Sequence, residues 1–254
     1  MRYLPLTPTD RGAMLSRIGV NTIDDLFIDV PEAARLDGPI NLPPHQSEMQ
    51  VERDLFAMAA QNKTASTVPF FCGAGAYKHH VPASVDHIIQ RSEFLTSYTP
   101  YQPEITQGTL QYLFEFQTQV CELTGMPVAN ASMYDGSTAT GEAVLMAHRI
   151  TRKKRAVISA RLHPHYRDVI DNLSDMGGFD VASPADSFNG VEDLIALIDE
   201  DTSSVVVQYP DFFGNIMDYS TLAREVQSRG CVLIVVVPEI ISLGLFTRAG
   251  DVGA

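Results

Sequence analysis

The sequence predicts an α/β protein built on an open, mostly parallel β-sheet with helices on its faces. Four short apolar runs of strand length lie in the second half of the chain, and helical patterns follow the first three. The last two runs, 203–209 and 231–237, are apolar almost throughout, which is typical of parallel strands covered on both faces. Short links between strands and helices favour right-handed β-α-β units.

Composition and charge narrow the function classes. The 254 residues are 45% hydrophobic and 19% charged, which is ordinary for a globular protein. The formal net charge of −13 argues against nucleic acid as a ligand, because phosphate binding requires clustered cations. We interpret the one basic run, 152–155, as a solvated connection between a helix and a strand.

Cysteine usage and hydropathy indicate a soluble cytoplasmic protein. Cys72, Cys121 and Cys231 are far apart and odd in number, so neither a disulfide framework nor a zinc site fits. No apolar run reaches the roughly 18 residues of a membrane span, and the N-terminus lacks a signal-peptide pattern. The motifs of nucleophilic and metal hydrolases are missing as well, so we expect no membrane, nucleic acid or metal ion among the partners.

The first third of the chain is predicted to be helical and irregular. Thr9 can cap a helix that ends at Gly19, and Ser47 can cap a second helix. Four prolines make 31–44 a surface loop. The segment 67–108 is predicted to be irregular and rich in aromatic residues, and long passages of this kind are usually functional or interfacial.

From residue 109 the pattern becomes regular. One helix is predicted to end at Gly125, and another to follow the turn at 134–136. Strands then alternate with helices, the strands at 155–160, 178–183, 203–209 and 231–237 and the helices at 163–177, 190–200 and 218–230. We expect a helical extension over 1–66 and an α/β domain over 67–254. Since the sheet would end with an unprotected edge, we expect this domain to be truncated before its last strands.

The string FCGAGAYKHH has two alternative interpretations. Gly73 and Gly75 follow an apolar run, as in a dinucleotide-binding loop, but no third glycine follows and Pro82 stands where a helix should open. We favour a glycine-rich turn that positions Tyr77 and His79.

Two further stretches are candidates for ligand contacts. Ser137 and Thr138 stand at a helix start, where free N–H groups and the helix dipole favour an anion; an ordinary N-cap is the alternative. His163 lies just after a strand, at the sheet edge where α/β proteins bind ligands. It can stack on a planar ring or be part of a surface histidine pair with His165.

The loop TSYTPYQPEITQG, 96–108, carries polar groups between two prolines. Tyr98, Tyr101, Gln102 and Glu104 directly precede a long amphipathic helix. Such a segment is either a well hydrogen-bonded loop or a stiffened, substrate-facing one.

Taken together, these stretches resemble the P-protein of the glycine cleavage system, and more closely its amino-terminal half, which in many bacteria is a separate subunit 1. The resemblance rests on FFCGAGAYKHHVPASVDHIIQRSEFLTSYTPYQPEITQGTLQYLFEFQTQVCELTGMPVANASMYDGSTATGEA and on the SLG of IISLG. It covers nearly the whole chain, and the string YTPYQPE followed by QG and ANASMYDGSTA is highly specific.

The resemblance implies a fold, a reaction and partners. The fold is that of aspartate-aminotransferase-like, pyridoxal phosphate (PLP)-dependent transferases, with a mostly parallel seven-stranded sheet and a C-terminal small domain. The reaction is the decarboxylation of glycine on PLP, with transfer of the aminomethyl group to the lipoyl arm of the H-protein. Subunit 1 is implied to act with a PLP-bearing subunit 2 in a heterotetramer, as part of glycine dehydrogenase (aminomethyl-transferring).

The sequence departs from the catalytic pattern of this fold. The last strand ends in Pro238 and Glu239 where an Asp is needed, and the four lysines, Lys63, Lys78, Lys153 and Lys154, all precede it. The resemblance therefore implies that subunit 2 holds PLP and the Schiff-base lysine, and that this chain alone is inactive. The loop with Tyr98, Tyr101, Gln102 and Glu104 would then reach into the partner's pocket and contact glycine or the cofactor.

Two other functions remain open at this point. The chain can serve as a scaffold or docking subunit that never touches substrate. It can also be an independent aminotransferase of the same fold, a reading that the missing Asp and Lys oppose.

Overall fold

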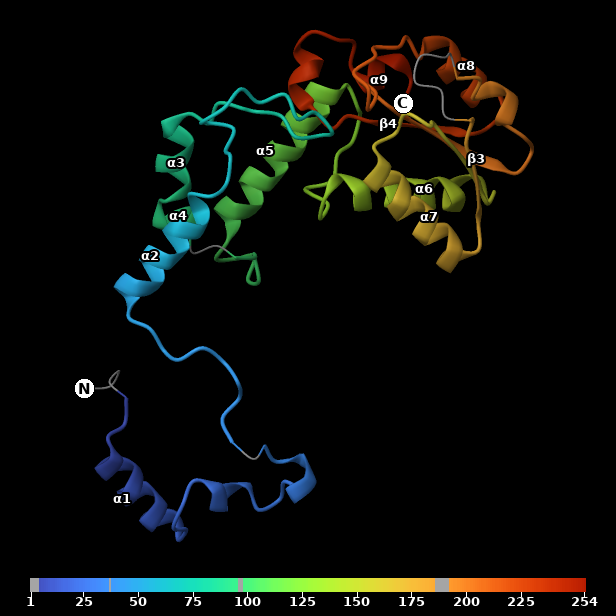
Figure 1. Ribbon diagram of the computed structural model, residues 1–254. Coiled ribbons are helices and arrows are strands. Elements are labelled where there is room, and N and C mark those ends of the chain that lie inside the picture. The colour runs from blue at the N-terminus through green and yellow to red at the C-terminus, as the bar shows by residue number, and fades with distance from the viewer. Residues whose placement is uncertain (1–4, 37, 96–97, 186–191) are drawn as a thin grey trace. The chain divides into compact units, whose positions relative to one another are not determined.

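The computed structural model describes residues 5–36, 38–95, 98–185 and 192–254. The chain divides into two compact units, Met1–Lys63 and Thr64–Ala254 (Figure 1). Each unit is described by itself.

In its described residues, 5–36 and 38–63, the first unit contains two α-helices and two short 3-10 helices. Helix α1, Pro8–Ile18, begins at Thr7 and not at Thr9 as predicted, because the Thr7 hydroxyl accepts the Asp10 N–H at 3.2 Å and Pro8 occupies the first helical position. Its predicted end at Gly19 is confirmed. Helix α2, Glu48–Ala59, starts directly after Ser47 as predicted, but the Ser47 side chain makes no capping hydrogen bond. The predicted loop 31–44 contains one 3-10 turn, Glu32–Ala34, and another turn, Asp24–Phe27, precedes it.

The second unit opens with helices that the sequence did not predict. Helices α3, Ala83–Ile89, and α4, Ser92–Leu95, lie inside the segment 67–108. Pro82 marks the start of α3 rather than a break, since proline lacks an N–H that a helix start does not use. Helix α5, Gln107–Thr124, ends at Gly125 in the left-handed conformation, as predicted.

Four parallel strands form the sheet, in the order β2-β1-β3-β4. They are β1, Arg155–Ile158, β2, Asp180–Ala182, β3, Thr202–Gln208, and β4, Val232–Val236. Each observed strand overlaps one of the four predicted strands. Every residue of β3 is buried, which confirms that this strand is covered on both faces.

Helices cover both faces of the sheet. Helices α6, Gly136–Thr151, and α7, Pro164–Gly177, pack on one face through Val144 and Ile170, which share a core with Ile158 and Val206. Helix α8, Ser220–Ser228, packs on the other face through Val226, which joins a core that includes Val157, Val205 and Val207. Strand alternation therefore places successive β3 valines in two different cores.

The remaining connections correct one prediction. The predicted helix 190–200 is only a 3-10 turn, Ile195–Leu197, within its described part 192–200. After β4 the chain forms a 3-10 segment, Ile240–Gly244, and the short helix α9, Ala249–Val252. Throughout the described ranges, every helix is too short or too polar to cross a lipid bilayer.

Candidate functional site

The carboxyl ends of the parallel strands gather polar groups from distant parts of the second unit. His163 follows β1, Asp211 follows β3 and Glu239 follows β4, so all three come to one edge of the sheet. The start of α6 joins this edge, because a cavity of about 250 Å³ is lined both by Gly136 of α6 and by Val236 of β4. This edge is the candidate site.

His163 is buried, and its ring is fixed from several sides. Its Nδ1 accepts the backbone N–H of His165 at 3.2 Å, and its Nε2 lies 3.0 Å from the carbonyl oxygen of Ala74. A neutral imidazole that is protonated on Nε2 satisfies both contacts. The ring also contacts Tyr166 and Phe212, with centroids 5.1 and 5.2 Å apart, so His163 stands in the protein interior rather than on the surface.

A glycine-rich turn covers the His163 ring. Gly73, Ala74 and Gly75 all have positive φ, at 67°, 51° and 79°. A Cβ on Gly75 would lie 3.3 Å from two atoms of the His163 ring, so glycine allows both the backbone conformation and the close approach. The preference for a turn over a dinucleotide loop is supported by this geometry.

The same turn reaches the end of β4. His79 Nε2 lies 2.7 Å from Glu239 Oε2, and Glu239 Oε1 accepts the N–H of Ile241 at 3.1 Å. The carboxylate after β4 is therefore engaged on both oxygens by groups of this chain.

The start of α6 is closed by its own carboxylate. Asp135 Oδ1 accepts the N–H of Thr138 at 2.7 Å and the hydroxyls of Ser137 and Thr138, each at 2.8 Å. These hydrogen bonds, first the backbone one from Thr138, lower the pKa of Asp135 below its usual value. The two hydroxyls predicted as an anion site thus form the cap of the helix, and an external anion would meet a carboxylate there.

Tyr166 links this helix start to His163. A Cβ on Gly136 would collide with the Tyr166 hydroxyl, so glycine at this position leaves room for the phenol. Burial, together with the charge of Asp135, raises the pKa of Tyr166. Tyr166 therefore lies between His163 and the start of α6 at Gly136, where Ser137 and Thr138 form the cap with Asp135.

A buried ion pair beneath this edge was not predicted from the sequence. Arg161 Nη1 lies 3.3 Å from Asp211 Oδ2, and the two side chains are only 7% and 0% exposed. Asp211 also accepts the N–H groups of Phe213 and Asn215, so it fixes the loop after β3. The only sequence signal is that charged residues directly follow two apolar strands.

The predicted loop 98–104 is separate from this cluster. Tyr98 is 94% and Tyr101 81% exposed, and Gln102 and Glu104 are exposed as well. Among the described residues, no hydrogen bond or ring contact joins these four to His163 or to the start of α6. The four side chains are thus accessible to another molecule.

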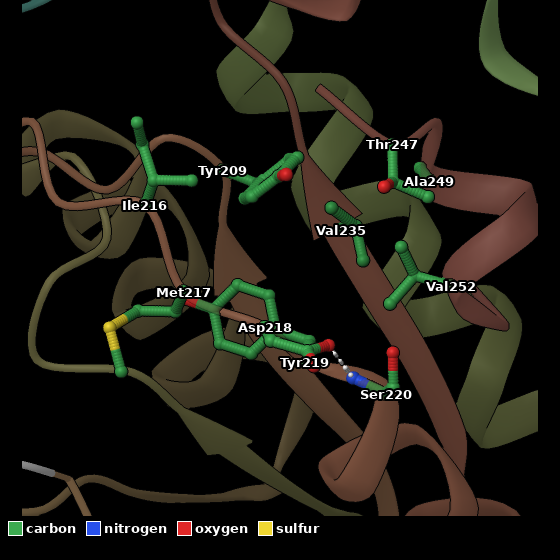
Figure 2. A pocket seen from close by; sticks show the side chains of 10 residues that line it. All are labelled: Tyr209, Ile216, Met217, Asp218, Tyr219, Ser220, Val235, Thr247, Ala249 and Val252. Carbon is green, nitrogen blue, oxygen red and sulfur yellow. Dashed lines mark hydrogen bonds between the residues drawn. The ribbon is translucent and has the colours of Figure 1, made fainter. Parts of the chain in front are cut away.

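Two cavities flank β4, one on each face of the sheet. The first is the cavity of about 250 Å³ beside α6. The second, of about 260 Å³, is lined by Val235 of β4, by Tyr209 and the residues 216–220 that lead into α8, and by Thr247, Ala249 and Val252 at α9 (Figure 2). Its walls are mainly apolar, and among its polar groups the Asp218 carboxylate accepts the backbone N–H of Ser220 at 2.9 Å. Both cavities therefore mark incompletely covered surface beside the last strand of the sheet, not a cluster of reactive groups.

The family of the chain follows from comparison with known proteins. The profile of the glycine cleavage system P-protein family matches residues 1–254. The chain belongs to the glycine cleavage system P-protein family.

Relatives and solved structures agree with this assignment. Glycine dehydrogenase (decarboxylating) subunit 1 of Parvibaculum lavamentivorans is 60% identical over 255 residues, and that of Methylocella silvestris is 62% identical. Each match covers 100% of this chain and 57% of the relative, so the chain spans little more than half the length of these P-protein subunits.

The structural comparisons confirm the PLP-dependent transferase fold. A crystal structure of glycine decarboxylase (P-protein) in inhibitor-bound form has a TM-score of 0.84 and 38% identity, over 100% of this chain and 57% of that one. A sphingosine-1-phosphate lyase from Burkholderia pseudomallei has a TM-score of 0.55 at 15% identity over 81% of this chain and 51% of that one, and so shows the fold alone.

Proposed function

We propose that this chain is part of subunit 1 of a glycine-cleavage P-protein, and that with a second subunit it decarboxylates glycine and passes the aminomethyl group to the lipoyl arm of the H-protein. The observation that carries the proposal is the match of the whole chain, at about 60% identity, to proteins named as this subunit. The role of the chain is to shape a shared active site, and the chain alone is inactive.

The cofactor is proposed to be held by the partner subunit, because the strand-end groups of this chain do not fit PLP. The helix start that would bind a phosphate is filled by Asp135. The ring of His163, which would stack on the cofactor, is covered by Gly75. Glu239, near where a pyridinium partner would stand, is paired with His79, and no lysine follows β4 as far as residue 254.

The exposed loop 98–104 is proposed as the contribution of this chain to the partner's pocket. The phenols of Tyr98 and Tyr101 can donate hydrogen bonds to the carboxylate of glycine, and the carboxylate of Glu104 can accept from its amino group. Pro100 and Pro103 restrict the backbone, so less conformational entropy is lost when these groups meet a small substrate.

Substitutions in this loop test the proposal. In the complex reconstituted with subunit 2 and H-protein, Tyr98→Phe and Glu104→Gln should lower kcat/KM for glycine by about 10-fold or more each, which corresponds to one charge-assisted hydrogen bond. Glu200→Gln, an exposed carboxylate elsewhere, is the matched control. Unchanged kinetics with intact assembly would support the scaffold or docking role instead.

A titration of the chain with PLP separates the partner-subunit role from an independent aminotransferase. Borohydride reduction should leave no lysine adduct at a specific site. A single trapped adduct on Lys63, Lys78, Lys153 or Lys154 would restore the aminotransferase interpretation.

Size-exclusion chromatography of the mixture with subunit 2 tests the proposed heterotetramer. The three free cysteines are consistent with the cytoplasm as its compartment.

A further inference from the structure

The hydrogen-bond contact between His79 Nε2 and Glu239 Oε2, at 2.7 Å, joins segments that are 160 residues apart in the chain. Their side chains are 44% and 21% exposed, and a hydrogen bond that water can reach contributes little net stability. The pair nevertheless closes a contact between the glycine-rich turn and the end of β4, at the edge where all the strand-end groups meet. A stabilising role alone does not account for this placement.

The turn 73–79 is held at a second point by His163. The carbonyl of Ala74 accepts from Nε2 of this buried histidine, and Gly75 packs on the imidazole ring. Ala74 has a φ of 51°, which is unfavourable for a residue with a side chain and persists only where the surroundings enforce it. The turn is thus fastened in one strained shape over the carboxyl ends of β1 and β4.

The residues that flank these two contacts face solvent. Phe71 is 94% exposed, Cys72 is exposed and Tyr77 is about half exposed. Phe71, which directly precedes the turn, and Tyr77, which lies within it, are therefore aromatic groups that another molecule can contact beside the candidate site.

We propose that His79 and Glu239 are positioning residues of the shared active site, which hold the turn 73–79 in the one shape that fits against the partner subunit's pocket. This inference rests on the proposed function and adds a second contributing element to it, distinct from the loop 98–104. Small displacements of positioning elements reduce turnover strongly, because the reacting groups lose their alignment.

The test uses two variants at one position. His79→Ala removes the contact, whereas His79→Gln keeps an N–H at about the reach of Nε2, so its amide can still donate to Glu239. In the reconstituted complex, His79→Ala should lower kcat for glycine by about 10-fold or more with less than about a twofold change in KM, and His79→Gln should recover most of it. Glu239→Ala should lower kcat similarly, and the double variant His79→Ala/Glu239→Ala should be no worse than either single one.

A matched control and a second readout make the outcome decisive. Glu225→Ala removes a half-exposed side-chain contact elsewhere, the ion pair with Arg229, and should leave kcat unchanged. A nitroxide label on Cys72, in a Cys121→Ser background with Cys231 buried, reports the mobility of the turn. The label should be immobilised in the wild type and with His79→Gln, and mobile with His79→Ala.

Two results would overturn the inference. One is an assembled His79→Ala complex with unchanged kcat, and the other is a label at Cys72 whose mobility does not respond to His79→Ala. If the wild-type complex does not turn over glycine at all, the proposed function fails. An unchanged label mobility would then refute the fastening of the turn independently.

Discussion

The buried pair of Arg161 and Asp211 gives the sharpest stability prediction. Asp211→Asn keeps the size of the side chain but removes the charge that faces Arg161. It also turns one acceptor oxygen into an N–H donor, and both oxygens of Asp211 are in use. Oδ1 accepts the N–H groups of Phe213 and Asn215 at 2.9 and 2.8 Å, whereas Oδ2 accepts from Arg161 at 3.3 Å and from the Asn215 amide at 2.9 Å. At least one of these donors loses its acceptor in a site that water does not reach.

The expected magnitude follows from this burial. Disrupting one partner of a buried ion pair costs about 3–5 kcal/mol, and we expect about 3 kcal/mol because one acceptor oxygen remains. For a chain of this size the loss should lower Tm by about 6–12 °C. Urea unfolding followed by circular dichroism measures the change in the free energy of unfolding directly.

An exposed pair provides the comparison. Glu225→Gln removes the carboxylate that lies 3.6 Å from Arg229, and both side chains are close to half exposed. This variant should cost no more than about 0.5 kcal/mol. If Asp211→Asn also cost less than about 1 kcal/mol, the pair would not fix the loop after β3 and the reasoning from burial would be refuted.

Three further predictions concern other parts of the second unit. Burial lowers the pKa of His148 below its usual value of 6.5, so as the pH falls the unfolded chain takes up a proton at His148 before the folded chain does. The midpoint of urea unfolding should therefore fall as the pH drops below about 6.5, and His148→Phe should flatten that dependence. Gly136→Ala should cost about 1–3 kcal/mol in urea unfolding because its Cβ collides with Tyr166, and a loss below about 0.5 kcal/mol would contradict the packing. Gly75→Ala should cost about 1–2 kcal/mol, since it combines a positive φ with a close contact to His163; nuclear magnetic resonance should show a shifted His163 ring signal, and an unchanged signal would contradict this contact.

The strands and the helices that cover them could be predicted because their signals are local. The apolar runs of β3 and β4 are of strand length, and the helices between strands have amphipathic patterns with glycine at their ends. The hydrophobic period of each helix and strand is then enough to predict that helices pack on both faces of the sheet. Even the parallel arrangement follows from the alternation of strands and helices.

The errors come from signals that allow two local structures. Proline at 82 ends one segment and starts α3, and the sequence alone favoured the first reading. Thr7 and Thr9 are both good caps, and only Pro8 and the reciprocal bond to Asp10 decide between them. The stretch 192–200 has a helical pattern, but its described part forms only a single 3-10 turn.

The candidate site was only partly predictable because its contacts are long-range. Ser137, Thr138 and His163 were found from their positions at a helix start and after a strand, and in the structure Tyr166 lies between His163 and the first residue of that helix, Gly136. His163 contacts Ala74, which is 89 residues away, and His79 of the same glycine-rich turn contacts Glu239, which is 160 residues away. No periodicity or spacing in the sequence encodes such pairs.

The hydrogen bonds of the carboxylates at this edge bear on whether the edge binds a charged ligand itself or supports a binding site elsewhere. Asp135, Asp211 and Glu239 each accept hydrogen bonds from groups of this chain, and those groups come from a helix start, a buried arginine and a turn. A charged ligand that bound here would have to break these hydrogen bonds, and leaving their donors unpaired would cost binding free energy. These contacts hold the edge in place, and such preorganisation is what the proposed role, presenting groups to a site on another subunit, would require.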